Sequence, residues 1–204
     1  MWQALQDELG ELGFTVITVA LDKDPEDARP WIEAAVPTHP SLIDTDWSFA
    51  DLYNVVNVPT VLWIDETGRI VRPNDSVYVT GDYIQVHGID PEPHLARIRA
   101  WVRTGAGALS EDEARRLQPV PDDDHQLARA HFTLAQWLYR NGHPERGDAQ
   151  FIRAGELAPQ DFTIRRGSMP MRGIDAAGPA FRDMVSDWIG KGNPYYETLP
   201  DTAG

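Results

Sequence analysis

The chain contains no cysteine among its 204 residues, so these residues can form no disulfide, no thiolate metal site and no thiol nucleophile. Long hydrophobic runs are also lacking. No stretch of about 18 apolar residues is present, and the sequence predicts no membrane-spanning helix. Basic residues are scarce, with 18 Lys and Arg against 32 Asp and Glu and a formal net charge of −14. Because phosphate backbones and anionic membranes would meet a repulsive field, we expect neither nucleic acid nor a membrane as a partner.

Sequence motifs for several other kinds of site are absent. The six histidines show no paired metal-binding spacing, and there is no glycine-rich phosphate loop or Gly-x-Ser-x-Gly elbow. The acids before His125 favour a helix N-terminus over a cation site. Four acids follow predicted strands, at the edge where open α/β sheets bind ligands, but solvated loop acids are the better interpretation. These are Asp22, Asp24, Asp44 and Asp46. We predict no metal, no cofactor and no catalytic residue.

The first half of the chain, residues 1–104, alternates between helical and strand patterns. Predicted helices span 2–12, 24–35, a short segment capped by Ser48, and 91–103. Predicted strands span 14–22, 41–43, 61–64 and 69–72, followed by a candidate hairpin at 77–86. The first strand is almost continuously apolar, which is typical of a strand covered on both faces. This alternation indicates an α/β layer structure.

The second half, residues 105–204, is predicted to be all-α. Helices are expected at 110–118, where Ser110 and Glu113 form a capping box, from just after the acids 122–124 through about Arg140, and at 145–157 and 179–189. The segment after Pro159 is predicted to be irregular. Because the connection at 104–109 is short, we expect the two halves to pack into one unit. Five tryptophans are predicted to lie in the core or at that interface, namely Trp31, Trp47, Trp63, Trp101 and Trp137.

The stretch "NVVNVPTVLWIDETGRIVRP", residues 54–73, carries a specific resemblance. Its Val-Pro-Thr tripeptide, followed by a hairpin and preceded by a strand and a helix, resembles the thioredoxin fold, and within it the redoxin group of TlpA/ResA-like thiol–disulfide oxidoreductases. The resemblance covers roughly residues 2–104. It implies a thioredoxin-like three-layer α/β domain with a cis Val58–Pro59 bond. It also implies that Val58, Pro59 and Thr60 form an edge that binds an extended peptide by strand addition.

The chain departs from that group in one region. The group's first strand and its Cys-x-x-Cys motif are missing, because the chain begins inside what would be the first helix. The missing strand normally lies in the middle of the sheet, so two strand edges would stay unpaired at a cost of about 1–3 kcal/mol per buried polar group. A segment upstream of Met1, a strand from another copy in a homo-oligomer, or the 77–86 hairpin would fill the gap. The upstream segment is the preferred interpretation.

The helical half resembles one tetratricopeptide repeat, although a generic helical hairpin remains an alternative. The matching positions are Leu134, Ala135, Leu138, Gly142, Gly147, Phe151, Ala154 and Pro159. The large apolar side chains among them are expected to fill the space between two helices. Gly147 replaces the usual alanine and is expected to weaken its helix by about 1 kcal/mol. The helices at 110–118 and 179–189 are expected to cap the pair.

Two functional hypotheses follow. The first is a cysteine-free binding module that holds a protein or an extended peptide through the proline edge and the helical hairpin. The second is a fragment of a thiol–disulfide oxidoreductase, or of a peroxiredoxin relative, whose Cys-x-x-Cys lies upstream of Met1. As written, the chain shows no N-terminal export pattern, which predicts a cytoplasmic location.

Overall fold

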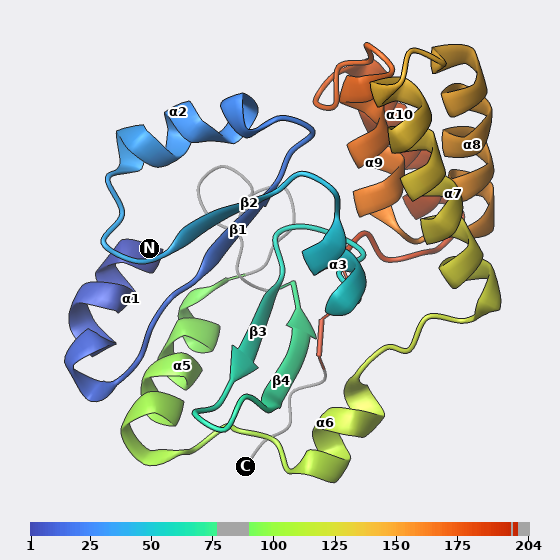
Figure 1. The fold of residues 1–204 in the computed structure, drawn as a ribbon. Helices are drawn as coiled ribbons and strands as arrows, with labels where there is room; N and C mark the ends of the chain where they lie inside the picture. Colours follow the sequence, from blue (N-terminus) through green and yellow to red (C-terminus); the bar gives the residue numbers. More distant parts are fainter. Residues whose placement is uncertain (77–89, 197, 200–204) are drawn as a thin grey trace.

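The computed structural model describes residues 1–76, 90–196 and 198–199. The candidate hairpin at 77–86 lies outside these residues. The first half contains α1 (Trp2–Leu9), the 3-10 turn η1 (Gly10–Leu12), β1 (Thr18–Leu21), α2 (Pro25–Ala35), β2 (Ser41–Asp44), α3 (Ser48–Leu52), β3 (Val61–Ile64), β4 (Ile70–Asp75) and α5 (Glu92–Thr104). The second half contains α6 (Glu111–Leu117), α7 (Asp123–Arg140), α8 (Pro144–Leu157), α9 (Phe162–Met171) and α10 (Pro179–Gly190). A mixed α/β half is thus followed by a helical one (Figure 1).

The strands form two separate pairs. β1 and β2 are parallel, with Thr18 opposite Ser41, and β3 and β4 are antiparallel, with Val61 opposite Asp75. Among the described residues, no strand joins the two pairs (Figure 1). The prediction of a long first strand covered on both faces is wrong, because β1 has only four residues and all four are half-buried. A strand with one unpaired edge loses the cover that a neighbouring strand would give.

One hydrophobic core joins α1, β3 and α5. Its buried members are Leu5, Leu9, Trp63, Leu95 and Ile98. Trp101 stacks on Trp63 with ring centroids 5.0 Å apart. Outside this core, Glu8 on α1 accepts hydrogen bonds from Arg99 and Arg103 on α5, and these bonds lower the pKa of Glu8. The two helices therefore lie side by side (Figure 1).

A second core joins the two halves, as predicted. It combines side chains around α3 with side chains of α7, α8 and α9, namely Trp47, Ala50, Val55, Ala128, Phe132, Ala135, Phe151, Ala154, Ala158 and Ile164. The Trp47 ring lies edge-on to Phe132 at 5.2 Å, and its Nε1 donates to the Thr163 carbonyl at 3.1 Å. Gly167 lies so close that an added Cβ would meet the Trp47 ring at 2.7 Å. The helical half thus packs directly on the α/β half.

The α7–α8 hairpin places most of the repeat positions as expected. Ala135, Leu138, Phe151 and Ala154 are buried between or beneath the two helices. The expectation for Leu134 is wrong: its side chain is 46% exposed, because it lies on the outer side of α7.

Gly147 does not act as a simple weak point in α8. An added Cβ would meet Tyr139 Cε2 at 2.7 Å and the Ala135 carbonyl at 3.2 Å. The Tyr139 hydroxyl donates to Asp148, which holds the ring in place, and burial together with this bond raises the pKa of Tyr139 to about 12. Close packing against Tyr139 therefore leaves little room for a side chain at Gly147, which gives a packing reason for glycine beside its expected cost in helix propensity.

The segment after Pro159 is helical, contrary to prediction. Asp161 caps α9 by accepting from the Ile164 amide, and the side chains of Phe162, Ile164 and Met169 are buried. It is α9 that packs against α7 and α8. The helix at 110–118 instead lies near β4, where the Leu109 amide donates to the Val71 carbonyl at 2.8 Å.

Two of the five tryptophans lie outside both cores. Trp31 on α2 is 79% exposed and Trp137 on α7 is 56% exposed, whereas Trp47, Trp63 and Trp101 pack as predicted. The helical spacing that places Trp31 and Trp137 on apolar stripes does not decide which stripe meets a neighbour.

Candidate functional site

The loop between α3 and β3 contains the three residues that the resemblance singled out. The Val58–Pro59 peptide bond is cis, as expected. The side chains of Val58 and Pro59 are exposed, and Thr60 is half-buried. The backbone of Val58 is not free, however. Its amide donates to Asn57 Oδ1 at 2.9 Å, and its carbonyl lies 3.5 Å from the Tyr196 hydroxyl. Both backbone groups of Val58 that strand addition would use therefore already have a contact within the chain. We call residues 54–60 the cis-proline loop.

The cis-proline loop is fixed by the helical half. The Phe162 amide, at the start of α9, donates to the Val56 carbonyl at 2.7 Å. Asn54 adopts a left-handed conformation with φ of 50° and is 6% exposed. Its amide donates to the Pro119 carbonyl at 3.0 Å, and its Oδ1 accepts from Arg129 at 2.6 Å. Hydrogen bonds from α7, α9 and the connection before α7 therefore hold this loop in one conformation.

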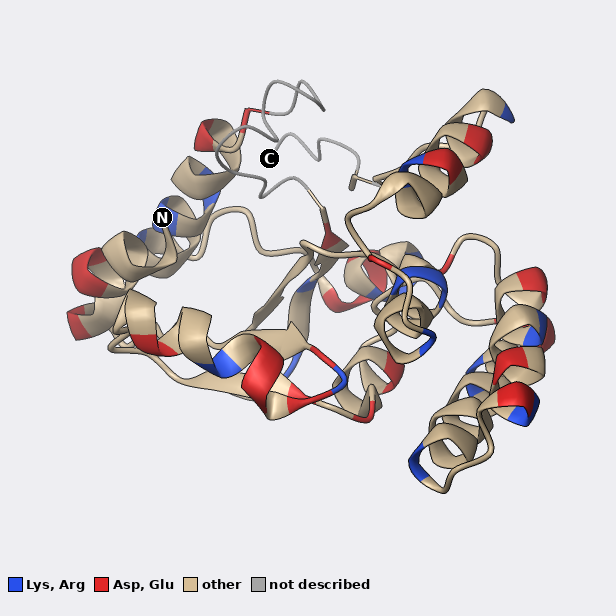
Figure 2. Ribbon diagram, turned by 90° about the horizontal axis from the view of Figure 1, so that it is seen from above, with Lys and Arg blue, Asp and Glu red and all other residues tan. Residues whose placement is uncertain are grey.

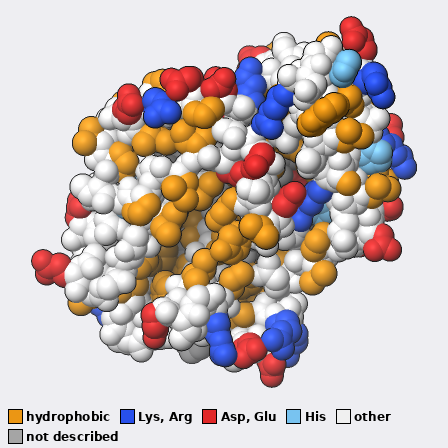
Figure 3. Space-filling model, viewed as in Figure 1, with side chains coloured by type: hydrophobic (Ala, Val, Ile, Leu, Met, Phe, Trp, Pro, Cys, Tyr) orange, Lys and Arg blue, Asp and Glu red, His pale blue; other side chains and the backbone are white. Residues whose placement is uncertain are grey.

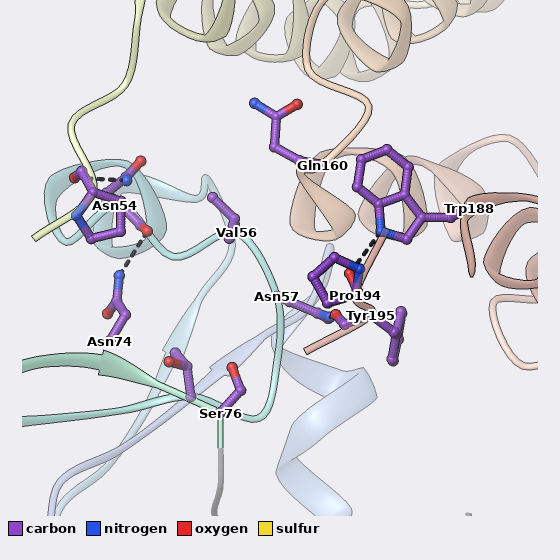
Figure 4. A pocket seen from close by; sticks show the side chains of 11 residues that line it. Asn54, Val56, Asn57, Asn74, Ser76, Gln160, Trp188, Pro194 and Tyr195 are labelled. Carbon is purple, nitrogen blue, oxygen red and sulfur yellow. Dashed lines mark hydrogen bonds between the residues drawn. The ribbon is translucent and has the colours of Figure 1, made fainter. Parts of the chain in front are cut away.

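A cavity of about 50 Å³ lies beside the loop (Figure 4). Its walls come from the loop, the end of β4 and the C-terminal segment, and they carry many amide and hydroxyl groups. The lining residues are Asn54, Val56, Asn57, Thr60, Asn74, Ser76, Pro119, Gln160, Trp188, Pro194 and Tyr195. The volume is enough for a small number of waters or for a few atoms of a ligand.

Two buried oxygens of this cavity have no hydrogen-bond partner among the described residues: Thr60 Oγ1 and Asn74 Oδ1. The amide nitrogen of Asn74 is fully used, since it donates to the carbonyls of Tyr53 and Asn54 at 2.9 and 2.7 Å. Most buried polar atoms in proteins are paired, so two unpaired acceptors in one cavity point to an external donor. Water, an ammonium group or a peptide N–H would supply one.

Sequence reasoning found Val58, Pro59 and Thr60 but missed Asn57, Asn74 and Tyr195. Asn57 and Asn74 flank the Val-Pro-Thr tripeptide and the hairpin that follows it. This enrichment in asparagine was the one local sequence signal for these two residues. No signal in the sequence pairs Tyr195 with Asn57.

The acids that follow the strands have structural roles. Asp44 is 7% exposed and accepts from the amides of Ser48, Phe49 and Ala50, so it caps α3. It is therefore not a solvated loop acid, and Ser48 is the first helical residue rather than the cap. Burial, more than the neighbouring Asp46, raises the pKa of Asp44. Burial likewise raises the pKa of Asp22. No group of three or more potential metal ligands occurs within the described part of the chain.

A second feature lies between the two strand pairs. The face in Figure 3 is hollowed there, and rows of hydrophobic side chains run along both sides of the hollow. Three large apolar side chains on or next to the strands are strongly exposed: Ile17 at 60%, Leu42 at 53% and Ile64 at 42%. The facing edges of β1 and β3 take part in neither strand pair. Unpaired strand edges beside exposed apolar side chains are places where another strand can pair.

Charges do not mark either feature as an anion site. Lys and Arg are interspersed with Asp and Glu along the helices and do not gather on one side of the described residues (Figure 2). No helix in the described ranges is long and apolar enough to cross a membrane. Comparison of the chain with protein-family models, curated proteins and solved structures found no match in any of the three.

Proposed function

We propose that this chain is a thioredoxin-like binding module that holds an extended polypeptide segment at the cis-proline loop. The observation that carries the proposal is the pair of unpartnered buried acceptors, Thr60 Oγ1 and Asn74 Oδ1, beside the exposed Val58 and Pro59. An unpaired buried acceptor costs about 1–3 kcal/mol, and a peptide that brings N–H groups to both would recover much of that cost. The resemblance to redoxins supplies the binding mode, which is strand addition at this edge.

The helical hairpin offers a second contact surface to the same partner. Leu127, Leu134 and Trp137 recur along α7 at helical spacing, and each is at least 46% exposed. Ile152 on α8 is 50% exposed. Such a stripe is typical of a surface that binds an apolar segment of another protein. The proposed partner is therefore a protein, with an extended stretch at the loop and apolar side chains against α7.

A Thr60→Val variant tests the loop. Valine keeps the shape of threonine and removes its hydroxyl, so a peptide that donates to Thr60 Oγ1 should bind about fivefold more weakly, which corresponds to about 1 kcal/mol. Peptides would be selected from a random phage-displayed library on the whole chain, and their affinities measured by fluorescence anisotropy. Thr15→Val, at an exposed position away from the loop, is the matched control. Equal affinities for both variants, or no peptide bound above scrambled controls, would contradict the proposal.

The hollow between the strand pairs favours a second candidate function. A strand inserted there would pair with the free edges of both β1 and β3. In the enzymes that the first half resembles, that strand leads into the Cys-x-x-Cys motif. The second candidate is therefore a thiol–disulfide oxidoreductase, in which the described residues supply the proline loop and preceding residues supply the redox pair. Mass spectrometry of the native protein from its source cells is the test. Peptides that extend upstream of Met1 and include Cys-x-x-Cys are expected, and a native N-terminus at Met1 would refute this candidate.

A further inference from the structure

The C-terminal segment of the chain, residues 193–196, lies against the cis-proline loop. The Tyr195 carbonyl accepts from Asn57 Nδ2 at 2.7 Å, and the Tyr196 hydroxyl lies 3.5 Å from the Val58 carbonyl. Asn57 is only 7% exposed, so its amide is a buried donor aimed at this segment. Pro194 and Tyr195 also form part of the cavity wall (Figure 4). The segment therefore contacts the two residues that precede Pro59 and shares the cavity wall with Thr60.

The contacts that place this segment come mostly from α9 and α10. Trp188 Nε1 donates to the Pro194 carbonyl at 2.8 Å, and the Tyr195 ring lies edge-on to Phe162 at 4.8 Å. On the loop itself, the contacts of the segment include a short hydrogen bond to Asn57 and a long contact to Val58. The segment is thus anchored to α9 and α10 and reaches the loop through Tyr195 and Tyr196.

The segment also pairs incompletely with the cavity. It leaves Thr60 Oγ1 and Asn74 Oδ1 without a donor, although Pro194 and Tyr195 line the same space. Proline has no N–H to offer, so the residue in that position cannot supply the missing bond. A peptide with a residue other than proline at that position, followed by an aromatic residue, would keep the Asn57 bond and bring a backbone N–H to a part of the cavity wall where Pro194 has none. The cavity thus favours such a ligand over the chain's own segment.

We propose that residues 193–196 are a built-in, exchangeable ligand of the cis-proline loop, and that external ligands are extended peptides with an aromatic residue at the Tyr195 position that displace it. The inference rests on the proposed peptide-binding function. It adds the chemical class of the ligand and the way in which binding of that ligand to the loop is regulated. The apparent affinity of an external peptide is then reduced by the fraction of molecules in which the segment occupies the loop.

The test compares the full chain with a Tyr195→Ser/Tyr196→Ser variant of the full chain. The probe is a fluorescein-labelled synthetic peptide with the sequence of residues 192–204, and a scrambled peptide is the control. The variant lacks the aromatic ring that packs on Phe162, so its segment should leave the loop, and it should bind the probe about tenfold more tightly than the unchanged chain. Adding Asn57→Leu to the variant should abolish this binding. Circular dichroism melts verify that all three chains are folded.

Hydrogen exchange of the unchanged chain gives a second readout. A saturating library-selected peptide should increase amide exchange in residues 193–199 and leave exchange in α1 and α5 unchanged. Equal affinity of the selected peptide for the unchanged chain and the variant, with no change in exchange, would overturn the built-in ligand and leave the binding function intact. Failure of the folded variant to bind either peptide would overturn both.

Discussion

Replacing Asp161 by alanine is expected to lower the free energy of unfolding by about 3–5 kcal/mol, as is typical when one partner of a buried pair is removed. Asp161 is 1% exposed, and its Oδ2 lies 2.8 Å from Nε2 of the buried His125. Its Oδ1 accepts from the Thr163 hydroxyl at 2.6 Å and from the Ile164 amide at 3.1 Å. The substitution therefore leaves a buried imidazole unpaired and also removes the N-cap of α9. Urea unfolding, followed by circular dichroism, measures the change.

Asp122→Ala is the matched control for Asp161. Asp122 also caps a helix, since its side chain accepts from the His125 amide at 2.8 Å, but it is exposed. Its removal should cost about 1 kcal/mol, the usual worth of an N-cap. If Asp161→Ala lost no more stability than Asp122→Ala, the buried pair with His125 would contribute nothing beyond a cap.

Replacing Trp47 by alanine should also cost about 3–5 kcal/mol, the range for truncating a buried aromatic side chain. Trp47 is 3% exposed and lies between the two halves, in contact with Phe132 and hydrogen-bonded to the Thr163 carbonyl. Its loss would leave a cavity at the junction, lined in part by Gly167, which has no side chain to fill it. Guanidinium unfolding, monitored by circular dichroism and by fluorescence, gives the free energy and tests whether both halves still unfold together.

Trp31→Ala provides the comparison for Trp47, because it removes the same side chain from a position that is 79% exposed. Its effect should stay within about 0.5 kcal/mol. Similar losses for the two variants, or two resolved transitions in the unchanged protein, would contradict a common core between the halves.

Local features of the fold could be predicted from the sequence, because their causes lie within a few residues. The capping box of Ser110 and Glu113 forms as expected, and so does the N-cap at Asp122. The helix α9 was missed because Gly167 and Pro170 resemble helix breakers. In the structure Gly167 gives Trp47 room, and Pro170 is the second-last residue of α9, so the hydrogen bond that it removes is at the end of the helix and leaves the preceding turns intact. The reason for that glycine is a residue far away in the sequence.

The candidate site also has a part that the sequence could predict and a part that depends on residues far away in the sequence. Val58, Pro59 and Thr60 form a contiguous signature that sequence reasoning could find. The residues that complete the cavity come from β4, the connection before α7, and the C-terminal segment. Packing of the helical half brings them together, and no periodicity in the sequence encodes that packing. For the same reason the exposed Trp31 and the buried Trp47 could not be told apart before the structure was known.

The hydrogen bonds on the cis-proline loop also set when the loop can form during protein synthesis. Val56 accepts from Phe162, and Asn57 donates to Tyr195, which lies 138 residues further along the chain. A ribosome synthesises the chain from the N-terminus, at about 5–20 residues per second, so the loop leaves the ribosome well before either partner exists. During that interval the loop lacks the contacts that fix its conformation. The cavity can therefore take its final shape only after Tyr195 has left the ribosome, at least 138 residues of synthesis after Asn57.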